Sequence, residues 1–278
     1  MKLNMLKINK IIENALIEDI GNGDITSESI FLDNKILSAS IVTREETVVC
    51  GVEVAERVFR MLDDRVKCKK LIKDGEHAKK GDVILKLKGP IKALLQGERV
   101  ALNFLQRMCG IATRTKKMVD IVKDYNVKIT DTRKTTPGLR ILEKYAVFVG
   151  GGTNHRFGLD DAVLIKDNHI KGVGGIKKAV ELVRKRVAYT TKIEVEVENL
   201  EQVEEALKLK VDIILLDNMD IKMLKQAVEM IGNKATTEAS GGIDEHNIKE
   251  VAATGVDCIS IGTLTHHIRS IDLSMMLD

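Results

Sequence analysis

The spacing of apolar residues predicts a helix near the start of the chain, followed by two strands and a second helix. The first helix places its apolar residues on one face at Ile8, Ile11, Ile12, Ala15 and Leu16. The turn-forming sequence Gly-Asn-Gly-Asp at residues 21–24 is expected to end it. Residues 36–42 and 47–50 read as strands, and apolar positions within residues 54–62 return to helical spacing.

A second helical pattern follows Pro90. Its apolar positions are Leu94, Leu95, Leu102, Leu105 and Met108. Because glycine weakens a helix interior, Gly110 is expected to break this pattern before another helix over residues 111–125.

From there the chain alternates between short apolar runs and amphipathic stretches. The apolar runs end at Asp131, Lys166, Glu196, Asp217, Ser240 and Gly262. Helices are predicted within residues 179–183, 203–207, 224–230 and 248–253. The last four strand ends are about 21 to 23 residues apart, which is the spacing of βα units with parallel strands. The pattern predicts an incomplete α/β barrel of six or seven strands, with a doubly wound open sheet as the alternative.

Composition narrows the class of protein. Hydrophobic residues make up 44%, charged residues 31%, and there are only 2 prolines, as in an ordered globular protein. No apolar run reaches about 18 residues, so no membrane span is expected. The first ten residues lack the apolar stretch of a signal peptide, and we expect a cytoplasmic protein.

Charge and cysteine content exclude further classes. The net charge of +3 comes from 44 basic and 41 acidic residues, a balance that argues against nucleic-acid binding. Few aromatic residues are present to stack on bases. The four cysteines are far apart and have no metal-binding spacing, so we expect free thiols in a reducing compartment.

Basic residues gather in the sequence between Asp131 and Lys166. They are Arg133, Lys134, Arg140, His155, Arg156 and Lys166. They lie among Pro-Gly and Gly-Gly-Gly sequences, where a ligand can approach the backbone closely. Since the carboxyl ends of parallel strands meet at one mouth, this pattern predicts a site for carboxylates or phosphates.

Acidic and glycine-rich strand ends are expected at the same mouth. Glu196 and Asp217 could hold Mg²⁺ through water, or stabilise a cationic sugar centre or ribose hydroxyls. The sequences at residues 240–242 and 261–263 resemble backbone cradles for phosphate.

Two of these interpretations have plain structural alternatives. Glu194, Glu196 and Glu198 alternate with apolar residues, and the pattern alone favours the solvent-exposed face of a strand. His169 follows Lys166 closely, and it either orients the lysine loop or only caps a helix.

Together these strings closely resemble the quinolinate phosphoribosyltransferase family over nearly the full chain. In the first part the resemblance rests on residues 18–21, 23–26, 97–99, Asn103 and 110–113. It continues through residues 131–135, 154–156, 164–169, 194–196, 216–218, 240–242 and 262–266. The resemblance implies an N-terminal α/β sandwich at residues 1–108, to which the tail at residues 266–278 returns. Residues 109–265 would form the incomplete α/β barrel.

The resemblance also implies a reaction. Members of this family join quinolinate to phosphoribosyl pyrophosphate and release pyrophosphate and CO₂, leaving nicotinate mononucleotide for NAD synthesis. The implied catalytic residues are Lys134, Lys166, Glu196 and Asp217. The implied substrate-binding residues are these four with Arg99, Thr132, Arg133, His155, Arg156, Ser240, Gly241, Gly242, Ile261, Gly262 and Thr263.

The same resemblance implies partners for the chain. Mg²⁺ would accompany phosphoribosyl pyrophosphate and be held by Glu196 and Asp217 through water. A homodimer or higher homo-oligomer would share each active site, with Arg99 reaching the partner's site. Two alternatives are a related phosphoribosyltransferase acting on nicotinate or another base, and a non-catalytic anion-binding protein.

Overall fold

The computed structural model describes all residues from 1 to 278, and the chain divides into two compact units. The sandwich unit comprises Met1–Lys116, Thr135–Gly151 and Leu264–Asp278, and the barrel unit comprises Lys117–Lys134 and Gly152–Thr263. The division predicted between residues 108 and 109 falls inside one long helix, α4.

The sandwich unit is built around an antiparallel sheet of four strands in the order β12-β1-β5-β3. A second, two-stranded sheet pairs β2 with β4. Its elements are α1 (Met5–Ile20), α2 (Ile25–Ile30), β1 (Ile36–Thr43), β2 (Thr47–Val48), α3 (Val52–Leu62), β3 (Lys67–Lys70), β4 (His77–Ala78), β5 (Val83–Pro90), α4 (Ile91–Ile121, with its last residues in the barrel unit), α5 (Arg140–Val149), α11 (Thr263–His266, starting in the barrel unit) and β12 (Leu273–Leu277). Since β12 pairs with β1, the end of the chain completes the sheet that its beginning starts.

The first helix follows the predicted pattern. Ile8, Ile12 and Leu16 are buried along one face of α1, and the side chain of Asn4 accepts hydrogen bonds from backbone N–H groups of the first turn. The helix ends at Gly21, whose positive φ of 56° suits glycine.

The predicted helix break at Gly110 is wrong, because α4 continues through this position as one helix of 31 residues. The glycine serves close packing instead. A Cβ atom added to Gly110 would lie 2.3 Å from the carbonyl oxygen of Arg269, so only glycine lets the C-terminal segment pass this closely. Helix propensity alone could not reveal this contact.

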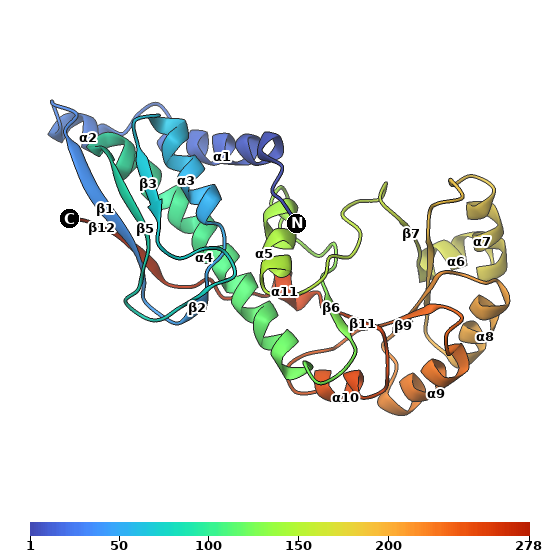
Figure 1. The fold of residues 1–278 in the computed structure, drawn as a ribbon. Coiled ribbons are helices and arrows are strands. Elements are labelled where there is room, and N and C mark those ends of the chain that lie inside the picture. Colours follow the sequence, from blue (N-terminus) through green and yellow to red (C-terminus); the bar gives the residue numbers. More distant parts are fainter. The chain divides into compact units, whose positions relative to one another are not determined.

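The barrel unit contains a sheet of six parallel strands in the order β6-β11-β10-β9-β8-β7. Its elements are β6 (Lys128–Thr130), β7 (Val163–Ile165), α6 (Asp167–Val173), α7 (Ile176–Arg184), β8 (Ile193–Val197), α8 (Leu200–Lys208), β9 (Ile213–Asp217), α9 (Ile221–Ile231), β10 (Thr236–Ser240), α10 (Ile248–Ala252) and β11 (Cys258–Ser260). Helices α7 to α10 lie along one side of this sheet (Figure 1).

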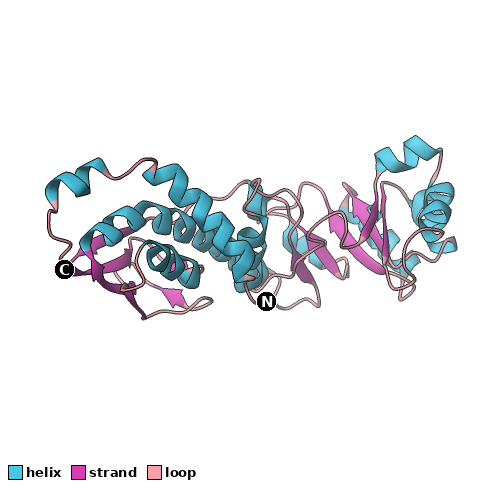
Figure 2. Cartoon of the chain, turned by 90° about the horizontal axis from the view of Figure 1, so that it is seen from above, coloured by secondary structure: helices cyan, strands magenta, loops and turns pink.

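The strand order decides between the two predicted architectures. A doubly wound sheet reverses its order at a switch point, whereas the strands here follow one another cyclically from β7 to β11 and on to β6. The first and last positions, β6 and β7, are not paired with each other. The prediction of an incomplete barrel with six strands is therefore confirmed, and in both units strands lie against helices (Figure 2).

Alternation along the barrel strands separates two environments. Val195 and Val197 of β8 are completely buried on the face that packs against helices. The residues that alternate with them, Glu194 and Glu196, therefore point to the inside of the barrel. No helix of the chain is both long and apolar enough to cross a membrane.

Candidate active site

A cavity of about 600 Å³ opens at the carboxyl ends of the barrel strands. Predicted residues that line it are Thr132, Arg133, Lys134, His155, Arg156, Lys166, Glu196, Asp217, Ser240, Gly241 and Gly242. Leu164, Leu215, Asn218, Glu238 and Ser260 complete the lining. All of these residues belong to the barrel unit, so parallel strands bring together side chains from positions 132 to 260.

The other predicted residues lie outside this lining. Arg99 is exposed on α4 in the sandwich unit. Arg140 begins α5 and donates to Thr135 in the same unit. Residues 261–263 follow β11 and do not line the cavity. Within β11, Ser260 alone lines it.

One wall of the cavity is cationic. The hydroxyl of Thr132 accepts a hydrogen bond from the backbone N–H of Lys134, which shapes the turn that carries Arg133 and Lys134. The guanidinium of Arg156 donates to the carbonyl of Ala162 at 2.8 Å. Burial and the neighbouring Arg133 lower the pKa of Arg156 from its ordinary value. An anion bound here would relieve this repulsion.

A buried carboxylate anchors the loop that holds His155. Asp131, completely buried just after β6, accepts hydrogen bonds from the side chain of Asn154 at 2.6 Å and from the backbone N–H of His155 at 2.9 Å. The loop at residues 154–156 is thereby tied to the carboxyl end of β6.

Lys166 faces the acidic wall. Its Nζ lies 2.6 Å from Oε2 of Glu196, and the Glu196 side chain is only 10% exposed. His169 caps α6, because its Nδ1 accepts the backbone N–H of Lys166 at 2.9 Å. The cap fixes the backbone from which Lys166 reaches into the cavity.

Asp217 and its neighbours form the opposite wall. Burial, and after it the neighbouring Glu196, raise the pKa of Asp217 above its ordinary value of 3.8. The side-chain amide of Asn218 donates to Asp217 at 2.7 Å, and its backbone N–H donates to the carbonyl of Ser240. Carboxylates from the neighbouring strands β8 and β9 are a suitable pair of oxygen ligands for a hard cation.

Backbone geometry brings the adjacent loop close to this wall. Asn218 has a φ of 53°, which is uncommon for a residue other than glycine. A Cβ atom at Gly241 would lie 2.1 Å from Oδ1 of Asn218, and Gly241 itself has a φ of 94°. Gly241 therefore lets the Ser-Gly-Gly turn lie close to the side chain of Asn218.

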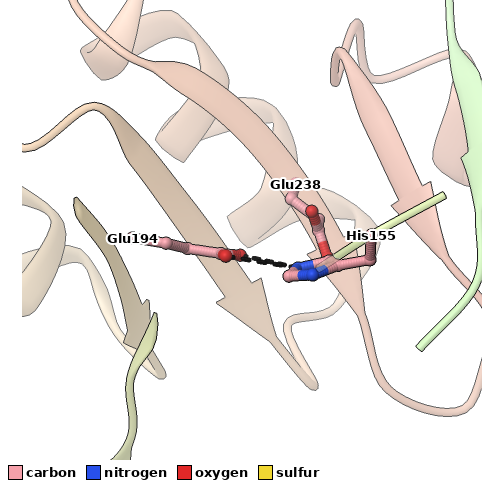
Figure 3. A group of neighbouring side chains, drawn as sticks. All are labelled: His155, Glu194 and Glu238. Atoms are coloured by element: carbon pink, nitrogen blue, oxygen red, sulfur yellow. Dashed lines mark hydrogen bonds and ion pairs between the residues drawn. The ribbon is translucent and has the colours of Figure 1, made fainter. Parts of the chain in front are cut away.

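Three side chains meet at the floor of the barrel, and the sequence pattern did not identify two of them. Nε2 of His155 lies 3.2 Å from Oε2 of Glu194 and 3.6 Å from Oε1 of Glu238 (Figure 3). The interpretation of Glu194 as solvent-exposed is wrong, because it is 2% exposed and faces the barrel interior. Glu238 precedes the strand end at Ser240 by two residues and so points to the same side, which is the signal that could have identified it.

The environment of Glu238 disfavours its ionised form. Its Oε1 is buried without a hydrogen-bond partner. Burial and the neighbouring Glu194 raise its pKa to about 7, although His155 and Ser260 act in the opposite direction. A carboxyl group that is neutral below this pH accordingly lies under the charged walls.

Replacing Glu238 with glutamine should raise the melting temperature, and the gain should depend on pH. Because the folded-state pKa of about 7 exceeds the ordinary 4.5, stability is lost as pH rises between these values. At pH 8 the ionised group costs about 3 kcal/mol, so Glu238→Gln should melt higher by roughly 5 °C. The gain should nearly disappear at pH 5.

Thermal unfolding at pH 5 and pH 8 tests this expectation. The matched control is Glu229→Gln, which makes the same chemical change on the exposed surface of α9. An equal effect of Glu238→Gln at both pH values would contradict the assignment.

The four cysteines at positions 50, 68, 109 and 258 are free. None of them lines the cavity. The barrel and its cavity are those of an α/β-barrel protein with a site suited to a multiply charged anion, set between a cationic wall and a pair of carboxylates.

Comparison with known proteins identifies the family. Residues 111–276 match the model of the quinolinate phosphoribosyl transferase C-terminal domain, and residues 24–109 match that of the N-terminal domain. The chain belongs to the quinolinate phosphoribosyltransferase family.

Individual relatives agree with this assignment. A probable nicotinate-nucleotide pyrophosphorylase (carboxylating) of Bacillus subtilis is 45% identical over 98% of this chain and 94% of its own. A mitochondrial quinolinate phosphoribosyltransferase (decarboxylating) of Nicotiana glauca is 39% identical over 98% of this chain and 82% of its own. The solved structure of the Francisella tularensis nicotinate-nucleotide pyrophosphorylase has a TM-score of 0.95 and 41% identity, covering 100% of this chain and 98% of that one.

Proposed function

We propose that this enzyme transfers the phosphoribosyl group of phosphoribosyl pyrophosphate to quinolinate. The product would be nicotinate mononucleotide, formed with release of pyrophosphate and CO₂ on the route to NAD. The observation that carries the proposal is the cavity in which Arg133, Lys134, Arg156 and Lys166 face Glu196 and Asp217. Membership of the family supplies the identity of the substrates.

The cationic wall suits the base. Quinolinate carries two adjacent carboxylates, and guanidinium groups bind carboxylates through paired hydrogen bonds. We infer that Arg133, Arg156 and Lys166 hold these carboxylates. Thr132 would support the same loop. His155 contributes through the protein, because both of its ring nitrogens are engaged with Glu194 and the backbone of Arg156. The pyridine nitrogen is already a nucleophile, so the attack on the sugar needs no general base.

The acidic wall suits the sugar and its metal. Glu196 and Asp217 would bind the ribose hydroxyls and, through water, the Mg²⁺ that accompanies the donor, whose preference for oxygen ligands these carboxylates meet. When bound, Mg²⁺ neutralises charge on the departing pyrophosphate. Lys134 and Lys166 would stabilise the same developing charge. The backbone at residues 240–242 and 261–263 would receive the 5′-phosphate.

Decarboxylation would follow from the new bond. The ring nitrogen bonds to C1 of the ribose as pyrophosphate leaves, and the nitrogen becomes positively charged. Loss of the 2-carboxylate as CO₂ then leaves its electron pair on the ring carbon beside this charge. That carbon takes a proton from water, and the cations of the site stabilise the intermediate.

We further propose a homodimer in which Arg99 completes the partner's site. Arg99 is exposed in the sandwich unit and does not line the cavity of the barrel unit, so a second copy of the chain could supply it.

A cytoplasmic location remains a prediction.

Purified protein with Mg²⁺ and phosphoribosyl pyrophosphate should release CO₂ from quinolinate and form a product with the mass of nicotinate mononucleotide. Carboxyl-labelled quinolinate and mass spectrometry measure both. Nicotinate, with one carboxylate, should react poorly because it leaves part of the cationic wall unpaired. Turnover of nicotinate but not quinolinate would contradict the proposal, and tight binding of quinolinate without turnover would indicate an anion-binding protein.

A further inference from the structure

A continuous hydrogen-bond path leads from strand β8 to the backbone of Arg156. The Glu194 side chain, which is 3% exposed, accepts from Nε2 of His155 at 3.2 Å. The other ring nitrogen, Nδ1, accepts the backbone N–H of Arg156 at 2.7 Å. Figure 3 shows the imidazole between Glu194 and Glu238, with the bond to Glu194 drawn as a dashed line.

These contacts select one tautomer of the ring. A nitrogen that accepts a hydrogen bond from an N–H group must present a lone pair, so Nδ1 of His155 carries no proton. A neutral imidazole then carries its proton at Nε2, the atom that faces Glu194. The hydrogen bond from the Arg156 backbone thus places the ring proton on Nε2, where the carboxylate of Glu194 accepts it.

The same logic argues against a metal ion at this cluster. One ligand atom each from His155, Glu194 and Glu238 lies within 4.8 Å of the other two, a spacing that a transition metal could use. A metal at Nε2 would need the proton on Nδ1, where the Arg156 N–H already donates. The geometry favours a hydrogen-bonded histidine over a coordinated one.

Arg156 is held at both ends by this arrangement. Its backbone N–H is fixed by His155, and its guanidinium donates to the carbonyl of Ala162. A long side chain that is ordered before a ligand arrives loses less entropy on binding. The position of the Arg156 guanidinium in the cavity thus depends on Glu194, which lies two residues before Glu196 on β8.

We propose that Glu194 is a positioning residue, which fixes Arg156 for the anionic base by holding the His155 ring in one orientation and one tautomer. This inference rests on the proposed role of Arg156 as a ligand of the substrate's carboxylates. It assigns to a buried glutamate an effect on substrate affinity without contact to the substrate.

Two variants separate hydrogen bonding from other effects. Glu194→Gln keeps an oxygen that accepts the Nε2 proton, whereas Glu194→Leu removes it. We expect Glu194→Leu to raise the KM for quinolinate at least about tenfold, the effect of losing one hydrogen bond to a charged group, while the KM for phosphoribosyl pyrophosphate changes little. Glu194→Gln should keep most of the affinity.

The second readout is the ¹⁵N NMR spectrum of histidine-labelled protein, with His155 assigned from His155→Gln. The unaltered protein and Glu194→Gln should show His155 as the Nε2–H tautomer, and Glu194→Leu should show a mixture. Val195→Ala is the matched control, because it removes buried volume from the helix-facing side of the same strand and should alter neither readout.

Three results would overturn the proposal. They are an unchanged quinolinate KM in Glu194→Leu, an Nδ1–H tautomer in the unaltered protein, and a stoichiometric metal whose removal by chelator changes the His155 signals. The tautomer is measured without substrate. If the unaltered protein failed to use quinolinate, the proposed function would fail while the NMR readout still tested the link between Glu194 and His155.

Discussion

Replacing Asp217 with alanine is expected to reduce kcat/KM for quinolinate by about 10²- to 10³-fold, the usual cost of losing a group that stabilises charge in the transition state. Asp217 ends β9 and lines the cavity with Glu196. Burial, and after it the charge of Glu196, raise the pKa of Asp217. The only other carboxylate of the lining, Glu238, lies two residues before the end of β10. We expect Glu196→Ala to have a similar effect.

The affinity for quinolinate separates this role from general damage to the site. Because Arg133, Arg156 and the other cations remain in Asp217→Ala, calorimetric binding of quinolinate should be nearly unchanged while turnover is lost. Asp220→Asn is the matched control. It removes a carboxylate three residues away, but asparagine still caps α9 as Asp220 does.

Retained turnover within roughly tenfold of the unaltered enzyme would contradict a catalytic role for Asp217. Loss of quinolinate binding in the same variant would also contradict it, since the carboxylate would then support the cationic wall and not the sugar.

The strand ends could be predicted because two simple regularities coincide there. Apolar runs marked the strands, and the parallel arrangement requires their carboxyl ends to meet. Asp131, Lys166, Asp217 and Ser240 were accordingly identified at or next to the ends of β6, β7, β9 and β10. These positions are fixed by local pattern and chain direction alone.

The floor of the barrel could not be predicted in this way. Alternation along β8 shows that Glu194 and Glu196 share a face, but it does not show whether that face meets solvent or the barrel interior. The decision depends on strand closure, which pairs β8 with β7 and β9. Gly110 presents the same difficulty, since its contact with Arg269 joins positions far apart in the sequence.

The loop after Lys134 illustrates a third limit. Residues 135–151 leave the barrel unit, and the side chain of Arg107 donates to both Thr136 and the buried Glu143 there. Only a network formed between separate segments of the sandwich unit determines this path. The sequence identified the cations at positions 133 and 134 but not the excursion that follows them.

Mixing two inactive variants, Arg99→Ala and Lys134→Ala, is expected to restore activity. If Arg99 of one subunit completes the site of its partner, every site in either variant alone lacks one of the two residues. A hybrid dimer has one site with both defects and one with neither. Random exchange should therefore return roughly a quarter of the sites to full activity.

The activity of the mixture and the extent of subunit exchange have to be measured together, the latter with two affinity tags. The matched control is a mixture of Arg133→Ala and Lys134→Ala, whose altered residues line the same cavity of one chain. No combination of these two chains yields an intact site, so this mixture should stay inactive. Activity in the first mixture alone would assign Arg99 to the partner's site. Full exchange without recovery would mean that Arg99 acts within its own subunit or has no role in the reaction.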